Sequence, residues 1–423
     1  MTPSRSLFRF GPFRIGSAAA LGLALGLSAC GGGGGGSSGG GGDGGPPPPP
    51  SATVVLVDPT SLNELEQLCD AKGATVLGPV EGTNYYEVSV PDGVDVDDFL
   101  ADLDDELEVE DGEHDEGVGV PEGGGGTQAA FVDDVFASIA TQPALALIGA
   151  PTAHARGYDG AGVVVAVIDT GVVASSPALA GHLMAGFDFV DGDSNPADVA
   201  NGVDEDKDGL IDEGVGHGTF VASLILAVAP NATIMPLRVL NSDSIGTAAS
   251  LARAIQYAVT NGADVINFSG GLAGQSLVIV QAAENAKAAG VYVVSAAGNR
   301  NLPQVDYPAN ASAVWAVSAV DATGRKASFA SYGSDVDLVA PGLDLLGAYP
   351  RAPSGLARWS GTSFSTALVT GAFALLRGED AGSPSKTLFE RLLDTAVPVD
   401  AVNPLYAGKL GKGRLDLAAA TAP

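Results

Sequence analysis

Apolar segments that alternate with helical segments are the feature that most constrains the fold of this chain. Residues 163–168, 265–268 and 291–294 are almost continuously apolar, and helical patterns such as 251–259 and 277–288 lie between them. Strands that are apolar on both faces and alternate with helices form parallel sheets covered by helices on both sides. Residues 130–423 are therefore predicted to form an α/β domain with a doubly wound, mainly parallel sheet. Ligands of such sheets bind beyond the carboxyl ends of the strands.

A second, smaller α+β domain is predicted for residues 51–116. The pattern indicates the order βαββαβ, with strands near 53–57, 85–90 and 107–109 and helices near 61–69 and 96–103. This order is that of a ferredoxin-like fold. Residues 117–129 are rich in glycine and separate the two predicted domains.

The N-terminus has the pattern of a bacterial export signal. Arg5, Arg9 and Arg14 precede an apolar run, residues 15–29, that is too short to span a membrane. The run ends in Leu-Ser-Ala followed by Cys30, which resembles a lipobox, where the cysteine is lipidated after cleavage. The alternative is an ordinary secretory signal in which Cys30 is incidental. We expect a signal peptide at 1–29, followed by the lipobox cysteine and a Gly/Ser/Pro linker at 30–50.

The net charge indicates which partners the chain can bind, and the cysteine count indicates whether it can form a disulfide. The formal net charge is −30, and residues 51–122 alone hold 21 acidic side chains and one lysine. Phosphate backbones repel such a chain, so nucleic acid is not an expected partner. The two cysteines are Cys30 and Cys69, so acylation of Cys30 leaves no intrachain disulfide.

Three polar residues are candidates for chemistry because of their positions. Asp169 ends an apolar strand, His217 lies between two glycines at the start of an apolar helix, and Ser363 precedes another such helix. Each has an ordinary alternative: a turn aspartate, a surface histidine and a helix cap. The Asp-Thr-Gly triplet at 169–171 also occurs in aspartic proteases, but those enzymes need two carboxylates and this chain has one such triplet.

The order Asp, His, Ser is that of the subtilisin triad. The stretches VAVIDTGV, GHGTFVAS, VVSAAGN and SGTSFSTALVTG resemble the signatures of subtilisin-like serine proteases, over about residues 140–420. The resemblance implies that Ser363 is the nucleophile, His217 the general base and acid, and Asp169 the group that orients the imidazole. Asn299 resembles the oxyanion donor of the family. Phe220 and Phe364 depart from the family pattern beside these residues.

The resemblance also implies a substrate site. Ser269, Gly270 and Gly271 resemble the edge to which an extended peptide adds as a strand. Ala297 and Gly298 resemble the opposite wall of the specificity pocket. Small residues on both walls predict a roomy, uncharged pocket for protein or peptide substrates.

The acidic loop before His217 predicts structural calcium, with no catalytic cofactor. Asp204, Asp206, Asp208 and Asp212 alternate around a glycine as in the start of a calcium loop, but position twelve is Val215 rather than Glu. The alternative is a solvated acidic loop.

Residues 51–116 resemble the inhibitory propeptides of the family, which implies an intramolecular inhibitor removed by self-processing at residues 117–129. The lipid on Cys30 would then anchor the precursor in the cell envelope, at the outer membrane or in the periplasm, until processing releases a monomeric protease. Two rivals remain: a binding lipoprotein that keeps the fold without activity, and a signalling protease with one partner.

Overall fold

The structure is a computed structural model that describes residues 53–107, 109–120, 130–131, 138–205, 207–272 and 274–423. The predicted signal peptide, Cys30 and the linker to residue 50 lie outside these residues, as do residues 121–129 of the predicted processing segment and Asp206. Residues 51–423 form one compact unit. In the described part of the chain, no helix is long and apolar enough to cross a membrane.

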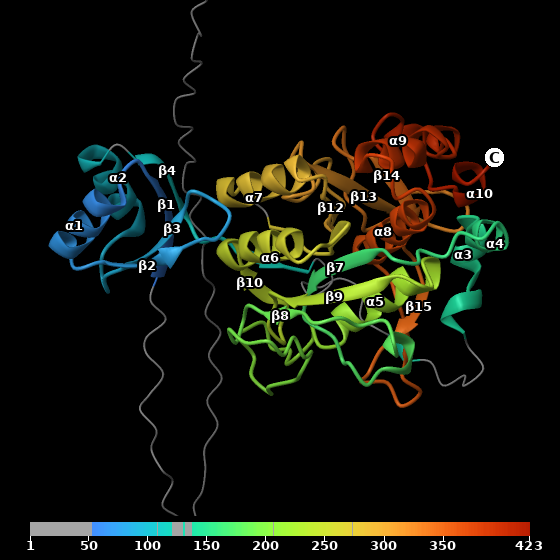
Figure 1. Cartoon of the computed structure of the whole chain (residues 1–423), viewed down its shortest axis with the longest axis horizontal. Coiled ribbons are helices and arrows are strands. Elements are labelled where there is room, and N and C mark those ends of the chain that lie inside the picture. Colours follow the sequence, from blue (N-terminus) through green and yellow to red (C-terminus); the bar gives the residue numbers. More distant parts are fainter. Residues whose placement is uncertain (1–52, 108, 121–129, 132–137, 206, 273) are drawn as a thin grey trace, which may run out of the picture. The chain divides into compact units, whose positions relative to one another are not determined.

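A seven-stranded sheet forms the centre of the large domain (Figure 1), and every neighbouring pair of strands in it is parallel. Its order is β14-β13-β12-β11-β7-β9-β8. In chain order the strands are β7 (Val164–Asp169), β8 (Phe187–Asp188), β9 (Thr233–Arg238), β11 (Val265–Phe268), β12 (Tyr292–Ala296), β13 (Val314–Val320) and β14 (Leu338–Pro341). The predicted doubly wound parallel sheet is confirmed.

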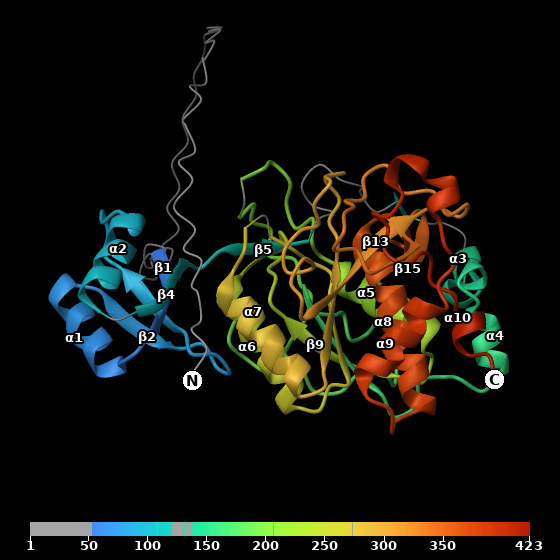
Figure 2. The same ribbon diagram turned by 90° about the horizontal axis from the view of Figure 1, so that it is seen from above.

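Helices cover both faces of this sheet (Figure 2). The helices α6 (Ala248–Thr260) and α7 (Leu277–Ala288) lie side by side on one face, and α5 (His217–Val228) and α8 (Thr362–Glu379) pack together on the other. In β7, Val165 and Val167 belong to the core beneath α5 and α8, whereas Ala166 and Ile168 belong to the core beneath α6. Two covered faces explain why the strand is apolar without alternation.

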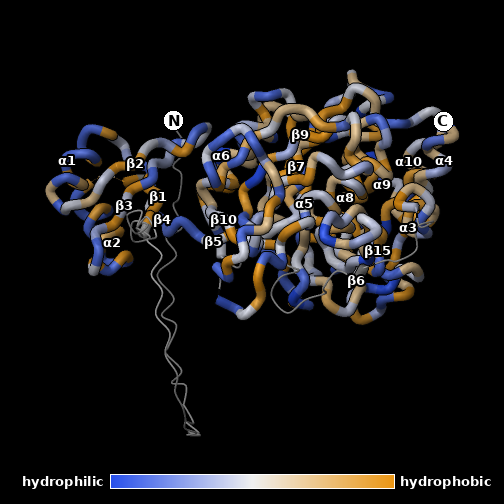
Figure 3. The backbone as a smooth tube through the Cα atoms, turned by 90° about the horizontal axis from the view of Figure 1, so that it is seen from below, coloured by the Kyte–Doolittle hydropathy of each residue, from blue (hydrophilic) through white to orange (hydrophobic). Residues whose placement is uncertain are grey.

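Smaller elements complete the large domain. A three-stranded antiparallel sheet and further short helices surround the main layers: β6 (Ala130–Phe131), β15 (Leu345–Ala348), β16 (Leu356–Trp359), α3 (Pro143–Leu147), α4 (Ala150–Ala155), α9 (Ser385–Asp394) and α10 (Leu417–Ala420). Among the described residues, 3₁₀ turns span Ile139–Thr141, Pro177–Leu179, Asp400–Val402 and Pro404–Tyr406. Figure 3 shows β7 and β9 as hydrophobic segments within the domain, with many hydrophilic segments at its periphery.

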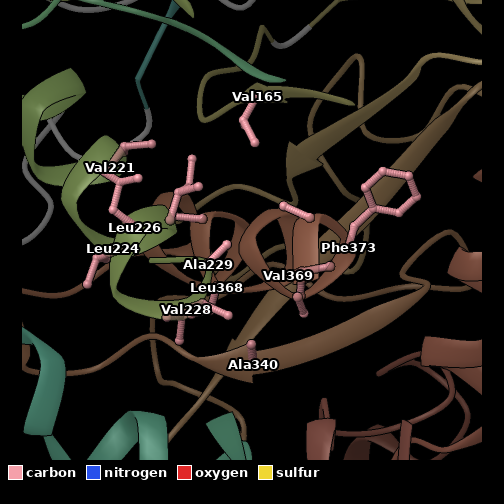
Figure 4. Packing of buried hydrophobic residues seen from close by; sticks show 14 of the residues in the cluster. Val165, Val221, Leu224, Leu226, Val228, Ala229, Ala340, Leu368, Val369 and Phe373 are labelled. Carbon is pink, nitrogen blue, oxygen red and sulfur yellow. The ribbon is translucent and has the colours of Figure 1, made fainter. Parts of the chain in front are cut away.

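The contact between α5 and α8 positions the start of each helix. Figure 4 shows apolar side chains of both helices together with Val165 of β7 and Ala340 of β14. Leu224, Leu368 and Phe373 are fully buried there. Each large apolar side chain in such a core contributes about 1.5–3 kcal/mol. His217 and Ser363, near the first residues of the two helices, are therefore held by a rigid support.

The N-terminal part of the compact unit has its own sheet, in the antiparallel order β2-β3-β1-β4. Its elements are β1 (Thr53–Pro59), α1 (Leu62–Lys72), β2 (Thr75–Pro79), β3 (Tyr86–Val90), α2 (Val96–Glu106) and β4 (Val109–His114). This connectivity is the ferredoxin-like one. Both helices pack on the face of the sheet that carries Val55 and Val57, and Cys69 is buried there as a free thiol.

Candidate active site

The strand β7 ends at Asp169, and the helix α5 begins at His217. Nδ1 of His217 lies 2.8 Å from Oδ1 and 3.0 Å from Oδ2 of Asp169. Both side chains are buried, with 0% and 1% of their surface exposed. Because a carboxylate only accepts hydrogen bonds, Nδ1 donates, and Nε2 is then the basic nitrogen of the neutral imidazole.

Glycines on both sides of His217 allow α5 to start close to β7. Gly216 is the N-cap residue and has a φ of 99°, which glycine adopts without strain. A Cβ on Gly218 would overlap the carbonyl of Gly171 and lie 3.1 Å from Oδ1 of Asp169. A larger residue at position 218 would therefore push His217 away from its carboxylate.

Ser363 is the second residue of α8. Its hydroxyl donates a 2.8 Å hydrogen bond to the carbonyl oxygen of Ser269, directly after β11. The helix start places backbone N–H groups and the positive end of the helix dipole beside this hydroxyl. The other hydroxyls of the segment contribute to its structure through bonds to nearby backbone or amide groups, namely those of Ser360, Thr362, Ser365 and Thr366.

An aromatic cluster connects His217 with the start of α8. The centre of the imidazole ring lies 5.6 Å from that of Phe364 and 5.5 Å from that of Trp359. Phe220, further along α5, lies 4.6 Å from Phe364 by the same measure. Such aromatic pairs stabilise beyond the area they bury. The two phenylalanines that depart from the family pattern thus pack together and hold the imidazole beside the residue that follows Ser363.

Asn299 is anchored to the residue that precedes Ser363. Its side-chain oxygen accepts hydrogen bonds from the backbone N–H of Thr362 at 3.0 Å and from the hydroxyl of Thr362 at 2.9 Å. This fixes the orientation of the amide, because its oxygen faces Thr362 and its NH₂ group is at the other end. A side-chain amide held in this way can donate to an oxyanion formed at Ser363.

Ser269, Gly270 and Gly271 form a backbone edge after β11. Gly271 exchanges two hydrogen bonds with Gly119, of 2.7 and 3.0 Å. The strand that ends there, β5 (Gly117–Gly119), also pairs antiparallel with β10 (Ile245–Thr247). A segment of the chain thus lies between β10 and Gly271, in the geometry expected of a peptide that adds as a strand.

A charged pair that was not predicted from the sequence lies beside the opposite wall, Ala297 and Gly298. The backbone N–H of Asp306 donates to the carbonyl of Ala297 at 3.0 Å, and the Asp306 carboxylate pairs with Arg300. A charged pair thus lies at a wall for which only small, uncharged residues were predicted. Asp306 follows an irregular segment rather than a strand, so no periodic pattern pointed to it.

The other histidines make local contacts. Nε2 of His114 lies 3.0 Å from a carboxylate oxygen of Asp97 at the surface. His154 and His182 contact the backbone carbonyl oxygens of Val228 and Ala232, at 2.7 and 3.1 Å. These contacts fit structural roles.

Asp198 is a buried carboxylate next to the loops that carry Asp169 and His217, and no sequence pattern pointed to it. It accepts hydrogen bonds from the hydroxyl of Thr170 at 3.1 Å and from the N–H of Gly216 at 2.7 Å. Thr170 and Gly216 flank Asp169 and His217 in the sequence. Asp198 therefore connects the two loops that carry the pair.

Burial raises the pKa of Asp198 to about 8; the Gly216 N–H lowers it and the charge of Asp169 raises it further. An unfolded Asp titrates near pH ~4, so the folded state binds this proton more tightly, and the stabilisation is lost as the pH rises through about 8. Asp198→Asn resembles the protonated acid. In a Ser363→Ala background, which prevents self-digestion, we expect it to change the midpoint of thermal unfolding little at pH 4 and to raise it by roughly 5 °C at pH 8.5. A difference that does not vary with pH would contradict this.

The acidic loop that was predicted to bind calcium uses its carboxylates locally. Asp204 accepts from the N–H of Gly209, Asp208 from that of Leu210 and Asp212 from that of Asn201, at 3.1, 2.8 and 2.8 Å. Within the described ranges, no group of three or more His, Cys, Asp or Glu side chains is arranged to hold a metal ion. The described carboxylates therefore show no calcium site by themselves, and Asp206, one of the four predicted ligands, lies outside the described residues.

A doubly wound parallel sheet that carries Asp169, His217 and Ser363 at its carboxyl edge, in that order along the chain, defines the subtilisin class of serine hydrolases. Residues 160–416 match the model of the Subtilase family. The chain belongs to the Subtilase family, and it is a serine endopeptidase.

Curated relatives agree with this assignment. The chain is 35% identical to subtilisin BL of Lederbergia lenta over 283 residues, which are 65% of this chain and 96% of that protein. It is 36% identical to thermitase of Thermoactinomyces vulgaris over 269 residues, 61% of this chain and 88% of that protein. Among solved structures, fervidolysin of Fervidobacterium pennivorans, described as a keratinolytic enzyme related to subtilisin, matches with a TM-score of 0.73 at 23% identity. That match covers 88% of this chain and 61% of fervidolysin, and it concerns the fold.

Proposed function

We propose that the chain hydrolyses peptide bonds through a triad of Ser363, His217 and Asp169. Ser363 Oγ attacks the carbonyl carbon of the substrate while His217 Nε2 takes its proton. The oxyanion accepts hydrogen bonds from the Asn299 amide and the N–H of Ser363. His217 then protonates the leaving amine, and water hydrolyses the acyl-enzyme with His217 as base. The buried contact between Asp169 and His217 is the observation that carries the proposal.

Contacts at two helix starts support an inhibitory role for residues 51–116. The carboxylate of Glu113 accepts from the hydroxyl of Ser276 at 2.7 Å and from the N–H of Leu277 at 2.6 Å, where α7 begins. Asp115 accepts from the N–H of Ala249 at 3.0 Å, where α6 begins. Carboxylates are stabilised at helix N-termini, so these contacts hold the acidic unit on the large domain.

The N-terminal unit also contacts α6 and α7, and the chain then continues to the substrate edge at Gly271. Arg253 of α6 forms ion pairs of 2.7 Å with Glu81 and Glu87. Leu56 and Tyr85 belong to the same apolar cluster as residues of α6 and α7. From this unit the chain continues into β5, which pairs with Gly271. Because β5 pairs with the edge to which a substrate is expected to add, these contacts support the proposal of an intramolecular inhibitor removed by self-processing.

We further propose that processing separates the protease from its anchor. Lipidated Cys30 lies on the N-terminal side of the segment 117–129, so a cut there leaves the anchor on the inhibitory unit. Before processing, the precursor is held at the cell envelope. Fractionation of cells with an antibody against the large domain tests this. Release of the large domain is expected for the active chain, and retention of all of it on the lipid anchor would refute the proposal.

Calcium binding by residues 204–212 stays a prediction, and the local hydrogen bonds of the loop do not favour it. It is tested by thermal unfolding of the Ser363→Ala chain with and without a chelator. If calcium is bound, its removal by the chelator should lower the midpoint of unfolding. An unchanged midpoint rules the site out.

The proposed function is tested by a time course of the purified precursor. Casein hydrolysis should be absent at first and should increase as the N-terminal unit is cut away. A processed large domain that leaves casein and a broad peptide library intact would favour the binding lipoprotein. Cleavage of a single library sequence without casein hydrolysis would favour a signalling protease.

A further inference from the structure

Asp306 lies where the two walls of the predicted specificity pocket meet. Its backbone N–H bonds to the carbonyl of Ala297 at 3.0 Å, on one wall. The next residue, Tyr307, exchanges hydrogen bonds of 2.8 and 3.0 Å with Leu272, which follows the other wall. Residues 306 and 307 therefore join the two walls.

The side chain of Asp306 lies in the space that the glycines of both walls leave open. A Cβ on Gly298 would overlap the Asp306 carboxylate, and a Cβ on Gly271 would lie 3.1 Å from the Cβ of Asp306. Small residues on the walls thus make room for a fixed carboxylate. The polarity of this space is set by Asp306 rather than by the walls.

Asp306 and its partner Arg300 differ in their exposure to solvent. The Asp306 side chain is 9% exposed, whereas that of Arg300 is 50% exposed. Burial raises the pKa of Asp306, and the hydrogen bond from Arg300 opposes this shift. A buried carboxylate that loses its cation is strongly destabilised, so Asp306 needs a positive partner. Arg300 meets this need from the surface, where its long side chain can move into water.

A substrate side chain that takes the place of Arg300 beside Asp306 must itself be cationic. An apolar side chain that separated the pair would leave the buried carboxylate without a cation. An acidic side chain would meet like charge. Lysine or arginine would restore the pairing while Arg300 returns to solvent, and arginine could bind both carboxylate oxygens.

We propose that the pocket between residues 269–271 and residues 297–298 accepts a lysine or arginine side chain of the substrate, and that Asp306 is the residue that determines this specificity. The residue concerned is the one whose carbonyl Ser363 attacks. The inference rests on the proposed function, because it assigns a substrate class to the same site.

Matched peptides test the proposal. The full chain, allowed to process itself, is given peptides that differ only in the residue before the scissile bond: Arg, Lys, Gln, Leu, Phe or Glu. We expect kcat/KM for Arg and Lys to exceed that for Gln and Leu by about 10–100-fold, as for a buried charge pair made only with the correct side chain. Labelling with a fluorophosphonate, measured in parallel, reports the active serine whichever peptide is preferred.

Two variants test whether the Asp306–Arg300 pair causes the preference for basic residues. Asp306→Asn keeps the shape and a hydrogen-bond acceptor but removes the charge, and it should remove the 10–100-fold preference for Arg and Lys over Gln and Leu. Arg300→Gln removes the competing cation and should raise kcat/KM for Lys several-fold. Asp344→Asn is the matched control, because it breaks another Asp–Arg pair, Arg358–Asp344, and should leave the preference unchanged.

Two results overturn the inference while the proposed function stands: a labelled enzyme that prefers Leu, Phe or Glu, or a preference for basic residues that persists in Asp306→Asn. Absence of both labelling and cleavage in the processed wild-type chain would instead mean that the proposed function has failed. If Asp306→Asn does not fold, the peptide series on the wild-type chain and on Arg300→Gln still decides.

Discussion

The Ser363→Ala variant is expected to lose about 10⁶-fold in kcat, a magnitude for which the subtilisin triad is itself the reference case. The proposed mechanism makes Ser363 Oγ the atom that bonds to the acyl group, and a methyl group cannot replace it. The precursor should also stay uncut, because the same hydroxyl is needed for self-processing. Peptide hydrolysis and the mass of the purified chain measure both effects.

Ser365→Ala is the matched control for this loss. Ser365 is two residues further along α8, is fully buried, and donates at 3.1 Å to the carbonyl oxygen of Ala340. Its removal should cost about 1 kcal/mol of stability, since one buried acceptor loses a donor, and should change kcat only several-fold. Similar losses in the two variants would mean that Ser363 acts through structure rather than as the nucleophile.

Asp169→Asn is expected to lower kcat by about 10⁴-fold without unfolding the chain. Both oxygens of Asp169 lie within 3.0 Å of Nδ1 of His217. An asparagine can present an N–H to Nδ1, which favours the tautomer with its proton on Nε2, and that nitrogen then cannot accept the proton of Ser363. Single-turnover hydrolysis of an activated ester, measured on the folded variant, checks this.

Asp198→Asn is the control here, because it removes a neighbouring buried carboxylate that binds Thr170 and Gly216. The asparagine oxygen can accept both hydrogen bonds, so activity should fall less than about tenfold. If Asp169→Asn kept a tenth or more of the wild-type kcat, the assigned role of Asp169 would be wrong.

The fold of the large domain could be predicted because several of its strands show the same apolar pattern. Strands such as β11 face helices on both sides and must be apolar on both faces, and this pattern is visible without a structure. The sequence also placed Asp169 at a strand end and His217 and Ser363 near helix starts, and the sheet order β12-β11-β7 then brings their surroundings to one edge.

Contacts made by irregular segments could not be predicted in the same way. Asp306 reaches the pocket walls through a loop, and Asp198 reaches Thr170 across 28 positions of the sequence. No periodic pattern connects such residues. The calcium prediction rests on spacing alone and stays a prediction: Asp204, Asp208 and Asp212 are spaced like a ligand set, and in the structure their carboxylates accept hydrogen bonds from nearby N–H groups. Local hydrogen bonding competes with metal binding for the same oxygens.

The most direct test of the central claim is to react the self-processed chain with a fluorophosphonate and to locate the label by mass spectrometry. The proposed mechanism predicts a single adduct on Ser363, and no adduct in Ser363→Ala. It also predicts a new N-terminus within residues 117–129 in the wild-type chain alone. A label on another residue, or no label after the N-terminal unit has been removed, would contradict the assignment of Ser363, His217 and Asp169 as a working triad.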